Sequence, residues 1–307
     1  MLFTFPRIPR SLVLLLLISA VEFLPAAGQS NSSIEAIAAT PSVRVTVDPR
    51  EIVRRSVEAD QRNTKLAKNY TYQERIVEKR LNKDGRAKKQ EIKTYDISIL
   101  YGEPYRRLIQ RDDRPLKEDE AKKEEEKLNK FIAKFKDETP KDREKRLAEA
   151  DKRREDQRAF AREIVDAYNF RLLGEGQVDG RGVFVIEAIP RPDFKPKQPR
   201  AELLSKFRGK IWIDKNEYQW VKMQAETIDT VSFGFFLFRL HKGSTLSFEQ
   251  TRVNEEIWLP RHIAVDASAR VALMMNAQFQ QETSFSNYRK FVTDSRILPG
   301  MEEAQPK

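Results

Sequence analysis

The sequence predicts an α+β protein whose larger part is a mainly antiparallel β-sheet. About ten segments alternate apolar and polar residues with the period of two that a half-buried strand requires. Most neighbouring segments are separated by only a few turn-forming residues, which favours antiparallel pairing. One long, highly charged segment with helical spacing interrupts the strands. Together these observations predict a sheet with an inserted charged helical hairpin.

The N-terminal segment has the pattern of an export signal. Arg7 and Arg10 precede an apolar run at residues 12–24, and small residues follow as far as Gly28. The run is interrupted by Glu22 and is shorter than the roughly 20 apolar residues of a membrane-spanning helix. We therefore expect cleavage after Gly28 and a periplasmic mature protein, with a retained N-terminal anchor as the alternative. The chain contains no cysteine, so packing alone must hold a fold that enters an oxidising compartment.

The domain organisation follows from these shifts in composition. We expect a signal peptide at residues 1–28, a flexible leader at 29–47, one domain at 48–295 with a helical insertion at 115–168, and a disordered tail at 296–307.

The first ordered element is predicted to be a helix that begins at Asp48. The aspartate can accept orphan amide protons, Pro49 has none to lose, and Glu51 lies near the positive end of the helix dipole. An apolar stripe then continues the helix to about residue 68. From Tyr70 the period changes to two, which predicts a strand, a turn at residues 83–86, a returning strand at 92–100 and a third strand at 105–110.

The charged segment covers residues 117–158. It holds 15 Lys plus Arg and 14 Asp plus Glu, and such balanced charges at helical spacing indicate solvated helices rather than a nucleic-acid arm. Thr139 and Pro140 divide it into two helices. Each helix has a narrow apolar edge, so we expect the hairpin to lean on the body. The residues of these edges are Leu128, Phe131, Ile132 and Phe135 in the first helix, and Leu147, Phe160, Ile164, Val165 and Tyr168 in the second.

Strands resume after the charged segment. Residues 170–177 and 182–189 flank a turn, a proline-rich loop follows at 191–200, and a short helix is predicted at 201–207. Residues 209–223 contain a strand, a turn and a strand. The remaining predicted strands are 231–240, 244–252, 257–266 and 269–285.

Several of these strands carry a family resemblance. The segments Gly-Lys-Ile-Trp-Ile-Asp-Lys at 209–215, Glu-Ile-Trp-Leu-Pro at 256–260 and Asn-Tyr-Arg at 287–289 resemble the periplasmic lipoprotein-carrier (LolA-like) family, which includes outer-membrane lipoprotein-sorting proteins. The resemblance covers about residues 50–112 and 165–292. It implies a strongly curved antiparallel sheet, an open half-barrel, whose concave side is covered by helices and holds acyl chains. It implies no catalytic residue and no cofactor.

The candidate ligand site centres on the strand predicted at 231–240, because both of its faces are apolar. One face must meet the core, and the other requires helices, a partner or an apolar ligand. Tryptophan has an apolar body with a polar edge that suits a pocket rim, and methionine adapts to flexible ligands. The alternative for all of these side chains is ordinary core packing. The candidate ligand-binding residues are Trp212, Trp220, Phe233, Phe235, Leu237, Phe248, Trp258 and Met274.

The sequence does not favour an enzyme. His241 and His262 are the only histidines and have no matching carboxylate spacing for a zinc site, and no nucleophile elbow or phosphate-binding loop occurs. We therefore expect a non-catalytic protein that binds a lipid or a lipidated protein, without nucleic acid, metal or cofactor.

Two further surfaces suggest other partners. The basic cluster Arg106, Arg107, Arg111 and Arg114 could contact a membrane surface peripherally, with a solvated edge strand as the alternative. The alternative function is an envelope protein-protein interaction or signalling module with a fully packed core. Its contact surface would be the charged helical hairpin.

Overall fold

The computed structural model describes residues 47–67, 69–82, 84–233, 238–271 and 275–290. The helices are α2 (Pro49–Ala67), α3 (Glu118–Lys136), α4 (Pro140–Ala167) and the 3-10 helix η1 (Pro199–Lys206). The strands are β1 (Tyr70–Leu81), β2 (Ala87–Leu100), β3 (Glu103–Arg111), β4 (Arg114–Pro115), β5 (Tyr168–Val178), β6 (Arg181–Pro190), β7 (Phe207–Asp214), β8 (Trp220–Thr227), β9 (Val231–Phe233), β10 (Phe238–Leu240), β11 (Thr245–Val253), β12 (Ile257–Val271) and β13 (Met275–Lys290).

All described strands belong to one sheet of 13 strands. The main path runs β4-β3-β2-β1-β13-β12-β11-β8-β7-β6-β5, and the pair β9-β10 joins it through β12. Every pairing between these strands is antiparallel. Because β4 and β5 lie at opposite ends of the path, the sheet is open. The predicted α+β class with a large, open antiparallel sheet is confirmed.

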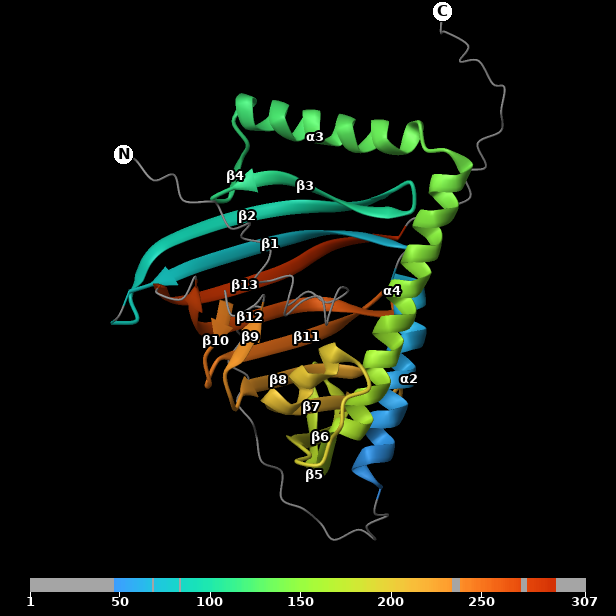
Figure 1. Cartoon of the computed structure of the whole chain (residues 1–307), viewed down its shortest axis with the longest axis vertical. Coiled ribbons are helices and arrows are strands. Elements are labelled where there is room, and N and C mark those ends of the chain that lie inside the picture. The colour runs from blue at the N-terminus through green and yellow to red at the C-terminus, as the bar shows by residue number, and fades with distance from the viewer. Residues whose placement is uncertain (1–46, 68, 83, 234–237, 272–274, 291–307) are drawn as a thin grey trace, which may run out of the picture.

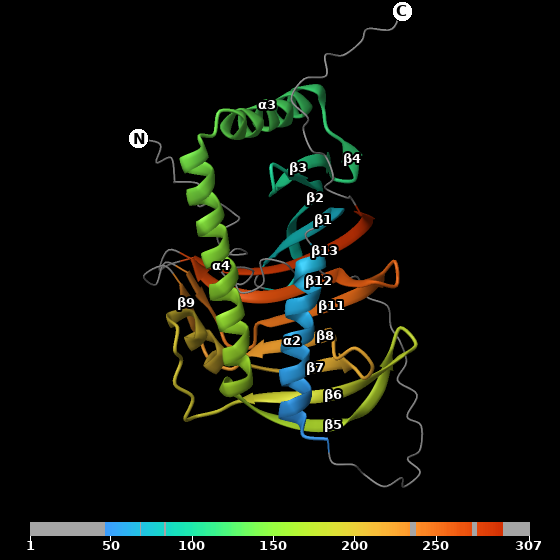
Figure 2. The ribbon, with the colours of Figure 1, turned by 90° about the vertical axis from the view of Figure 1, so that its right-hand side faces the viewer.

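Helices α2 and α4 lie on the same side of the sheet, and Figures 1 and 2 show them alongside each other over the strands from β12 to β5. Arg50 on α2 bonds to Asp166 on α4 at 2.7 Å. We call the face of the sheet that these helices cover the inner face. Within the described residues, no helix has the length and apolar character needed to span a membrane.

The sequence explains why α2 begins where it does and how it docks. The Asp48 side chain accepts the amide of Arg50 at 3.0 Å, and Pro49 occupies the first helical position. Ile52 and Val53 are buried against the apolar residues of β6 and β7. Both the start of this helix and its end near residue 68 agree with the prediction.

The charged insertion forms two helices that separate at Asp137–Thr139, as the Thr139-Pro140 pair predicts. Thr139 caps α4 by accepting the amide of Asp142. The two helices do not lie side by side, however: α3 passes over the β3 end of the sheet, whereas α4 runs along α2 (Figures 1 and 2). The reason is that the apolar edge of α3 packs on β3, where Phe131 meets Tyr105 with ring centroids 4.8 Å apart.

Two strand predictions are corrected. Residues 231–240 are not one strand, because β9 and β10 pair antiparallel with Phe238 opposite Phe233; residues 234–237 lie outside the described part. The boundary predicted between 266 and 269 is also wrong, since β12 continues to Val271 and β13 begins at Met275. In both cases the antiparallel pairing requires a reversal of the chain within a segment whose apolar residues continue the strand pattern. The predicted signal peptide, most of the leader and the C-terminal tail lie outside the described residues.

Candidate functional site

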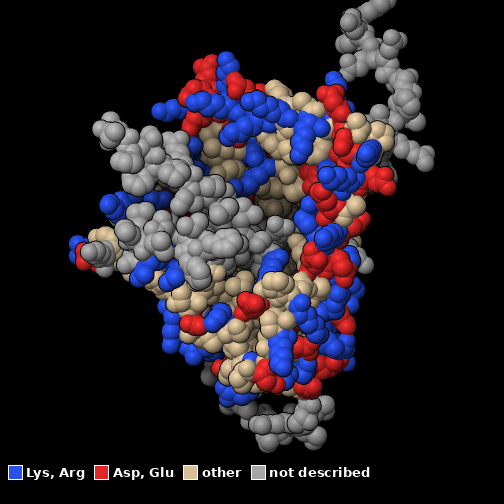
Figure 3. Space-filling view, in the orientation of Figure 1, with Lys and Arg blue, Asp and Glu red and all other residues tan. Residues whose placement is uncertain are grey.

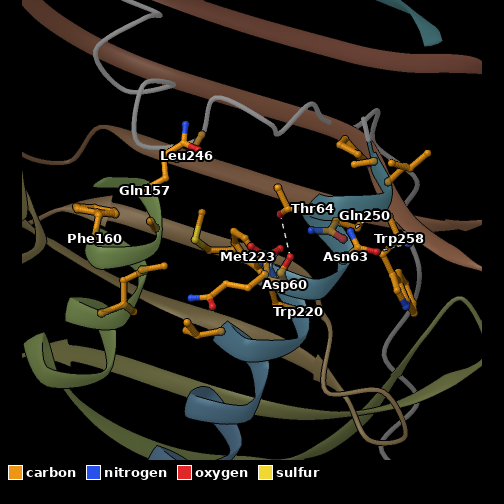
Figure 4. Close-up of a pocket in the computed structure, with 18 of the residues that line it drawn as sticks. Asp60, Asn63, Thr64, Gln157, Phe160, Trp220, Met223, Leu246, Gln250 and Trp258 are labelled. Atoms are coloured by element: carbon orange, nitrogen blue, oxygen red, sulfur yellow. Dashed lines mark hydrogen bonds between the residues drawn. The ribbon is translucent and has the colours of Figure 1, made fainter. Parts of the chain in front are cut away.

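A cavity of about 1620 Å³ lies between the inner face of the sheet and the helices α2 and α4. Figure 3 shows a hollow below α3 and beside α4, and Figure 4 shows side chains from both helices and from the sheet around the cavity. Typical small-molecule sites measure roughly 300–1,000 Å³. This cavity is therefore large enough for a long, flexible ligand.

One part of the cavity is apolar. On the sheet it is lined by side chains of β7, β8 and β11, and facing them are apolar side chains of α2 and α4. Within β7 every second residue points the same way, which brings Ile211 and Ile213 to the inner face. On β8 the register shifts at Val221, so Trp220 and Met223 line the same cavity although they are three residues apart. The principal apolar lining residues are Val53, Val57, Phe160, Ile164, Ile211, Ile213, Trp220, Met223 and Leu246.

The part of the cavity beside β1, β2 and β3 has a mixed lining. Here Arg106 bonds to Glu74 at 2.6 Å, and its guanidinium lies 3.6 Å from the centroid of the Tyr95 ring. Lys93 forms an ion pair with Glu91 at 2.9 Å. The same strands contribute apolar side chains to the lining, namely Tyr72, Ile76, Ile97 and Ile99. The charged groups of this part are therefore paired with each other and lie among apolar side chains.

A carboxyl group lies within the apolar part. The Oδ1 atom of Asp60 accepts hydrogen bonds from Trp220 Nε1 at 2.8 Å and from Gln219 Nε2 at 3.2 Å. Gln219 is also bonded to Gln250 at 3.3 Å. Burial raises the pKa of Asp60 above its ordinary value, although the two hydrogen bonds act in the opposite direction. Figure 4 shows Asp60 on α2 between Trp220, Met223 and Thr64.

A second side chain of α2, Asn63, also fixes the C-terminal half of this helix to the sheet. Asn63 Nδ2 donates to the carbonyl of Trp258 at 2.6 Å, and Asn63 Oδ1 accepts the amide of Trp258 at 2.9 Å. The amide side chain therefore pairs with β12 as a neighbouring strand would. This pairing holds Asp60, one turn earlier on α2, over the cavity.

The structure brings some of the predicted ligand-binding residues to the cavity. Trp220 and Trp258 are among its lining residues, but the indole of Trp258 packs with Val183, Val221 and Trp212 on the outer face, and its backbone bonds to Asn63 of α2. Phe248 lies against Trp220 with ring centroids 5.1 Å apart. Phe248 itself is buried and does not line the cavity.

Other predicted residues lie elsewhere. Trp212 points to the outer face, because its neighbours Ile211 and Ile213 line the cavity; it packs there with Val183, Val221 and Trp258. The backbone of Phe233 belongs to β9. Phe235, Leu237 and Met274 lie outside the described residues.

The basic cluster on β3 is largely compensated by acidic residues. Arg106 pairs with Glu74, Arg107 with Glu125, and Arg111 with both Glu91 and Glu120. Three of its four arginines therefore have anionic partners within the chain, and their availability for a membrane surface is reduced. Arg114 is exposed.

The histidines offer no arrangement for chemistry among the described residues. His262 is buried, and desolvation together with the charge of Arg261 lowers its pKa to about 2. Its Nε2 atom has no hydrogen-bond partner within the described part. No group of three His, Cys, Asp or Glu side chains in the same residues could hold a metal ion.

Sequence reasoning missed the contribution of α2 and of the first strands. Asp60 and Asn63 lie in the unbroken polar run 60–65 of a helix whose outer face is also polar, so spacing alone does not distinguish them. Glu74 and Glu78 share a strand face with Ile76, so the pattern does not mark that face as solvent or cavity. Their direction toward the cavity depends on the sheet register, which the sequence does not reveal.

Comparison with known proteins gives likenesses of fold only. No family model matches the chain, and no curated protein matches it. Solved structures to which it is similar are of the DUF1329 family and of the LolA superfamily and lipoprotein-sorting class. A DUF1329 family protein from Desulfovibrio piger shares 14% identity, with a TM-score of 0.31, over 81% of this chain and 96% of that one.

Two further structures are similar to a comparable extent. A putative outer membrane lipoprotein-sorting protein domain from Vibrio parahaemolyticus shares 12% identity, with a TM-score of 0.29, over 80% of this chain and 95% of its own. A LolA superfamily protein from Nitrosomonas europaea shares 10% identity, with a TM-score of 0.27, over 82% and 97%. Likenesses of this size carry no argument about function, which must come from the cavity itself.

Proposed function

We propose that this chain is a non-catalytic, exported protein of the bacterial envelope that binds the acyl chain of a lipid or of a lipidated protein in the cavity. The observation that carries the proposal is a cavity of about 1620 Å³ whose lining includes a group of apolar side chains from α2, α4, β7, β8 and β11. The pattern of an export signal in the first 28 residues supports a periplasmic location.

The binding energy would come from desolvation. Each methylene group moved from water into the apolar part contributes about 0.8 kcal/mol. Ten such groups contribute about 8 kcal/mol, and association itself costs about 4–15 kcal/mol. Ten groups therefore leave at most about 4 kcal/mol of net binding free energy, a dissociation constant of about 1 mM, and tighter binding requires that more of the acyl chain enter the cavity.

The helical cover supports exchange of the ligand. The C-terminal half of α4 is anchored by Phe160 and Ala167, which pack with Ala201 and Leu204 of η1. The N-terminal half carries mostly charged, exposed residues and has no apolar face on the sheet. It is held there by Arg146, which bonds to Glu103 of β3 at 3.1 Å and to Glu138 at 2.7 Å. Polar tethers of this kind can exchange with water, so this half can move away from the cavity more easily than the half that is packed on η1.

The alternative of an interaction module depends on a sheet interior that is filled by protein. The described residues instead enclose a large open volume. Acyl-chain binding is therefore the better supported function.

The test uses a residue whose enlargement fills the cavity. Ala225 on β8 lines the cavity beside Gly209, so the change Ala225→Trp places an indole in the apolar part. Ala121 on α3 is exposed and is not a lining residue, which makes Ala121→Trp the matched control. Binding of an environment-sensitive fluorescent fatty acid would be titrated for the mature protein and for both variants.

The proposal predicts saturable binding by the mature protein, a similar affinity for Ala121→Trp and at least tenfold weaker binding for Ala225→Trp, since displacing about two methylene groups already costs that much. Lipid extraction of the purified protein followed by mass spectrometry should recover an acyl compound. If no lipid is recovered and the probe shows no saturable binding, the protein is not an acyl-chain carrier.

A further inference from the structure

The carboxyl group of Asp60 is only half used by the protein. Its Oδ1 atom accepts two hydrogen bonds, from Trp220 and Gln219, whereas Oδ2 has no partner among the described residues. Protein surrounds the carboxyl group almost completely, yet Asp60 is partly exposed, and the space to which it is exposed is the cavity that it lines. One carboxyl oxygen is therefore available to whatever occupies the cavity.

No charged side chain within the described residues compensates Asp60. The groups that face it are uncharged: Thr64 on α2, Trp220 and Met223 on β8, and Gln250 on β11 (Figure 4). Its pKa is governed by desolvation and by the two hydrogen bonds, with no contribution from a neighbouring charge. An acceptor left without a donor in such surroundings destabilises the empty protein.

The position of this acceptor suggests what the ligand must supply. Met223 and Leu246 line the same part of the cavity, so a ligand in contact with them lies beside Asp60. A hydroxyl, amide N–H or ammonium group near that point would complete the hydrogen bonding of the carboxyl group. A free carboxylate would instead bring a second negative charge to a poorly solvated anion.

We propose that Asp60 Oδ2 is the polar anchor of the acyl-binding site, and that the cavity selects amphiphiles whose head group donates a hydrogen bond over free fatty acids. This inference rests on the proposed function, because it assigns the class of head group to the same cavity.

The hydrogen-bond pattern makes one substitution especially informative. In Asp60→Asn the side-chain oxygen must face Trp220 Nε1 and Gln219 Nε2, since both are donors. The NH₂ group then takes the place of Oδ2 and faces the cavity. The substitution converts the anchor from an acceptor into a donor with almost no change in shape.

The experiment measures how well head groups compete for the cavity. A neutral fluorescent hydrocarbon is bound to the mature protein and displaced by three compounds of equal chain length: a fatty alcohol, its fatty acid and the methyl ester. All are used below their aggregation concentrations, at a pH well above the usual carboxyl range. The variants are Asp60→Asn, Asp60→Leu and the control Glu58→Gln, which changes an exposed residue of the same helix.

For the wild type and Glu58→Gln we expect the alcohol to bind about tenfold more tightly than the acid or the ester. A tenfold ratio of affinities corresponds to about the free energy of one hydrogen bond to a charged group. Asp60→Leu should abolish this preference without lowering the affinity for the ester. Asp60→Asn should reverse it in favour of the acid.

Equal affinities for the three compounds in the wild type, or an unchanged order of affinities in Asp60→Asn, would contradict the proposal that Asp60 anchors the head group. The comparison in the wild type tests the proposal even if a variant fails to fold. If the hydrocarbon probe binds saturably but the three compounds have equal affinities, only the proposed role of Asp60 is wrong. If the probe does not bind at all, the proposed function is wrong as well.

Discussion

The docking of α2 through Asn63 gives a prediction whose size follows from the structure. In Asn63→Ala both hydrogen bonds to the backbone of Trp258 are lost, at 2.6 and 2.9 Å in the wild type. Each such bond contributes about 1 kcal/mol, so the free energy of unfolding should fall by about 2 kcal/mol. For a domain of this size that corresponds to a melting temperature lower by about 4–8 °C.

Thermal and urea denaturation of the mature protein, followed by circular dichroism, measure this loss. Arg62→Ala is the control, because Arg62 is an exposed neighbour on the same helix. Hydrogen exchange provides a local readout, since the Trp258 amide should lose protection in Asn63→Ala before the core of the sheet does. Equal stability of the two variants, or a Trp258 amide that remains as protected as in the wild type, would show that α2 is held by its apolar contacts alone.

Two other predictions concern the sheet and Asp60. Gly209→Ala would place a Cβ against the Gln224 carbonyl, whereas the Cβ of Gly182→Ala meets only a flexible side-chain atom of Lys215 at 3.5 Å. The free energy of unfolding, measured by urea denaturation, should therefore fall by about 1–3 kcal/mol in Gly209→Ala and by much less in Gly182→Ala. Equal losses would contradict the close approach of β7 to β8. The raised pKa of Asp60 means that ionisation of this carboxyl group costs more in the folded protein than in the unfolded chain, so its contribution to stability is complete below the ordinary carboxyl pKa and is lost as the pH rises through the higher folded value. The stability of the wild type minus that of Asp60→Asn should therefore decrease with rising pH, and a flat or increasing difference would show that the carboxyl group is well solvated.

Much of the fold could be predicted because local signals and tertiary structure agree. Asp48-Pro49 and Thr139-Pro140 mark helix starts by backbone chemistry, and that chemistry operates in the structure. The alternation around Trp212 and Trp220 marks strands whose short turn enforces antiparallel pairing. Such elements depend on residues that are near each other in the chain.

The cavity could be predicted only in part, because it depends on contacts between distant segments. The apolar faces of residues 231–240 predict a strand at its centre, but the lining of the described cavity comes mainly from α2, α4 and strands on both sides of β13. Whether Trp212 or Ile211 faces inward follows from the side on which the helices pack. Asp60 bonds to Trp220, 160 positions later in the chain, and no local sequence pattern predicts that contact.

The central claim, that an acyl chain occupies the apolar part of the cavity, can be tested most directly by photocrosslinking. A fatty acyl compound with a photoreactive group on its chain would be irradiated with the mature protein, and the modified residues identified by mass spectrometry. The account predicts modification of Ile211, Met223, Leu246 and Phe160, and its suppression by an excess of unlabelled lipid. Modification confined to the outer face around Trp212 or to α3, or modification that excess lipid does not suppress, would contradict it.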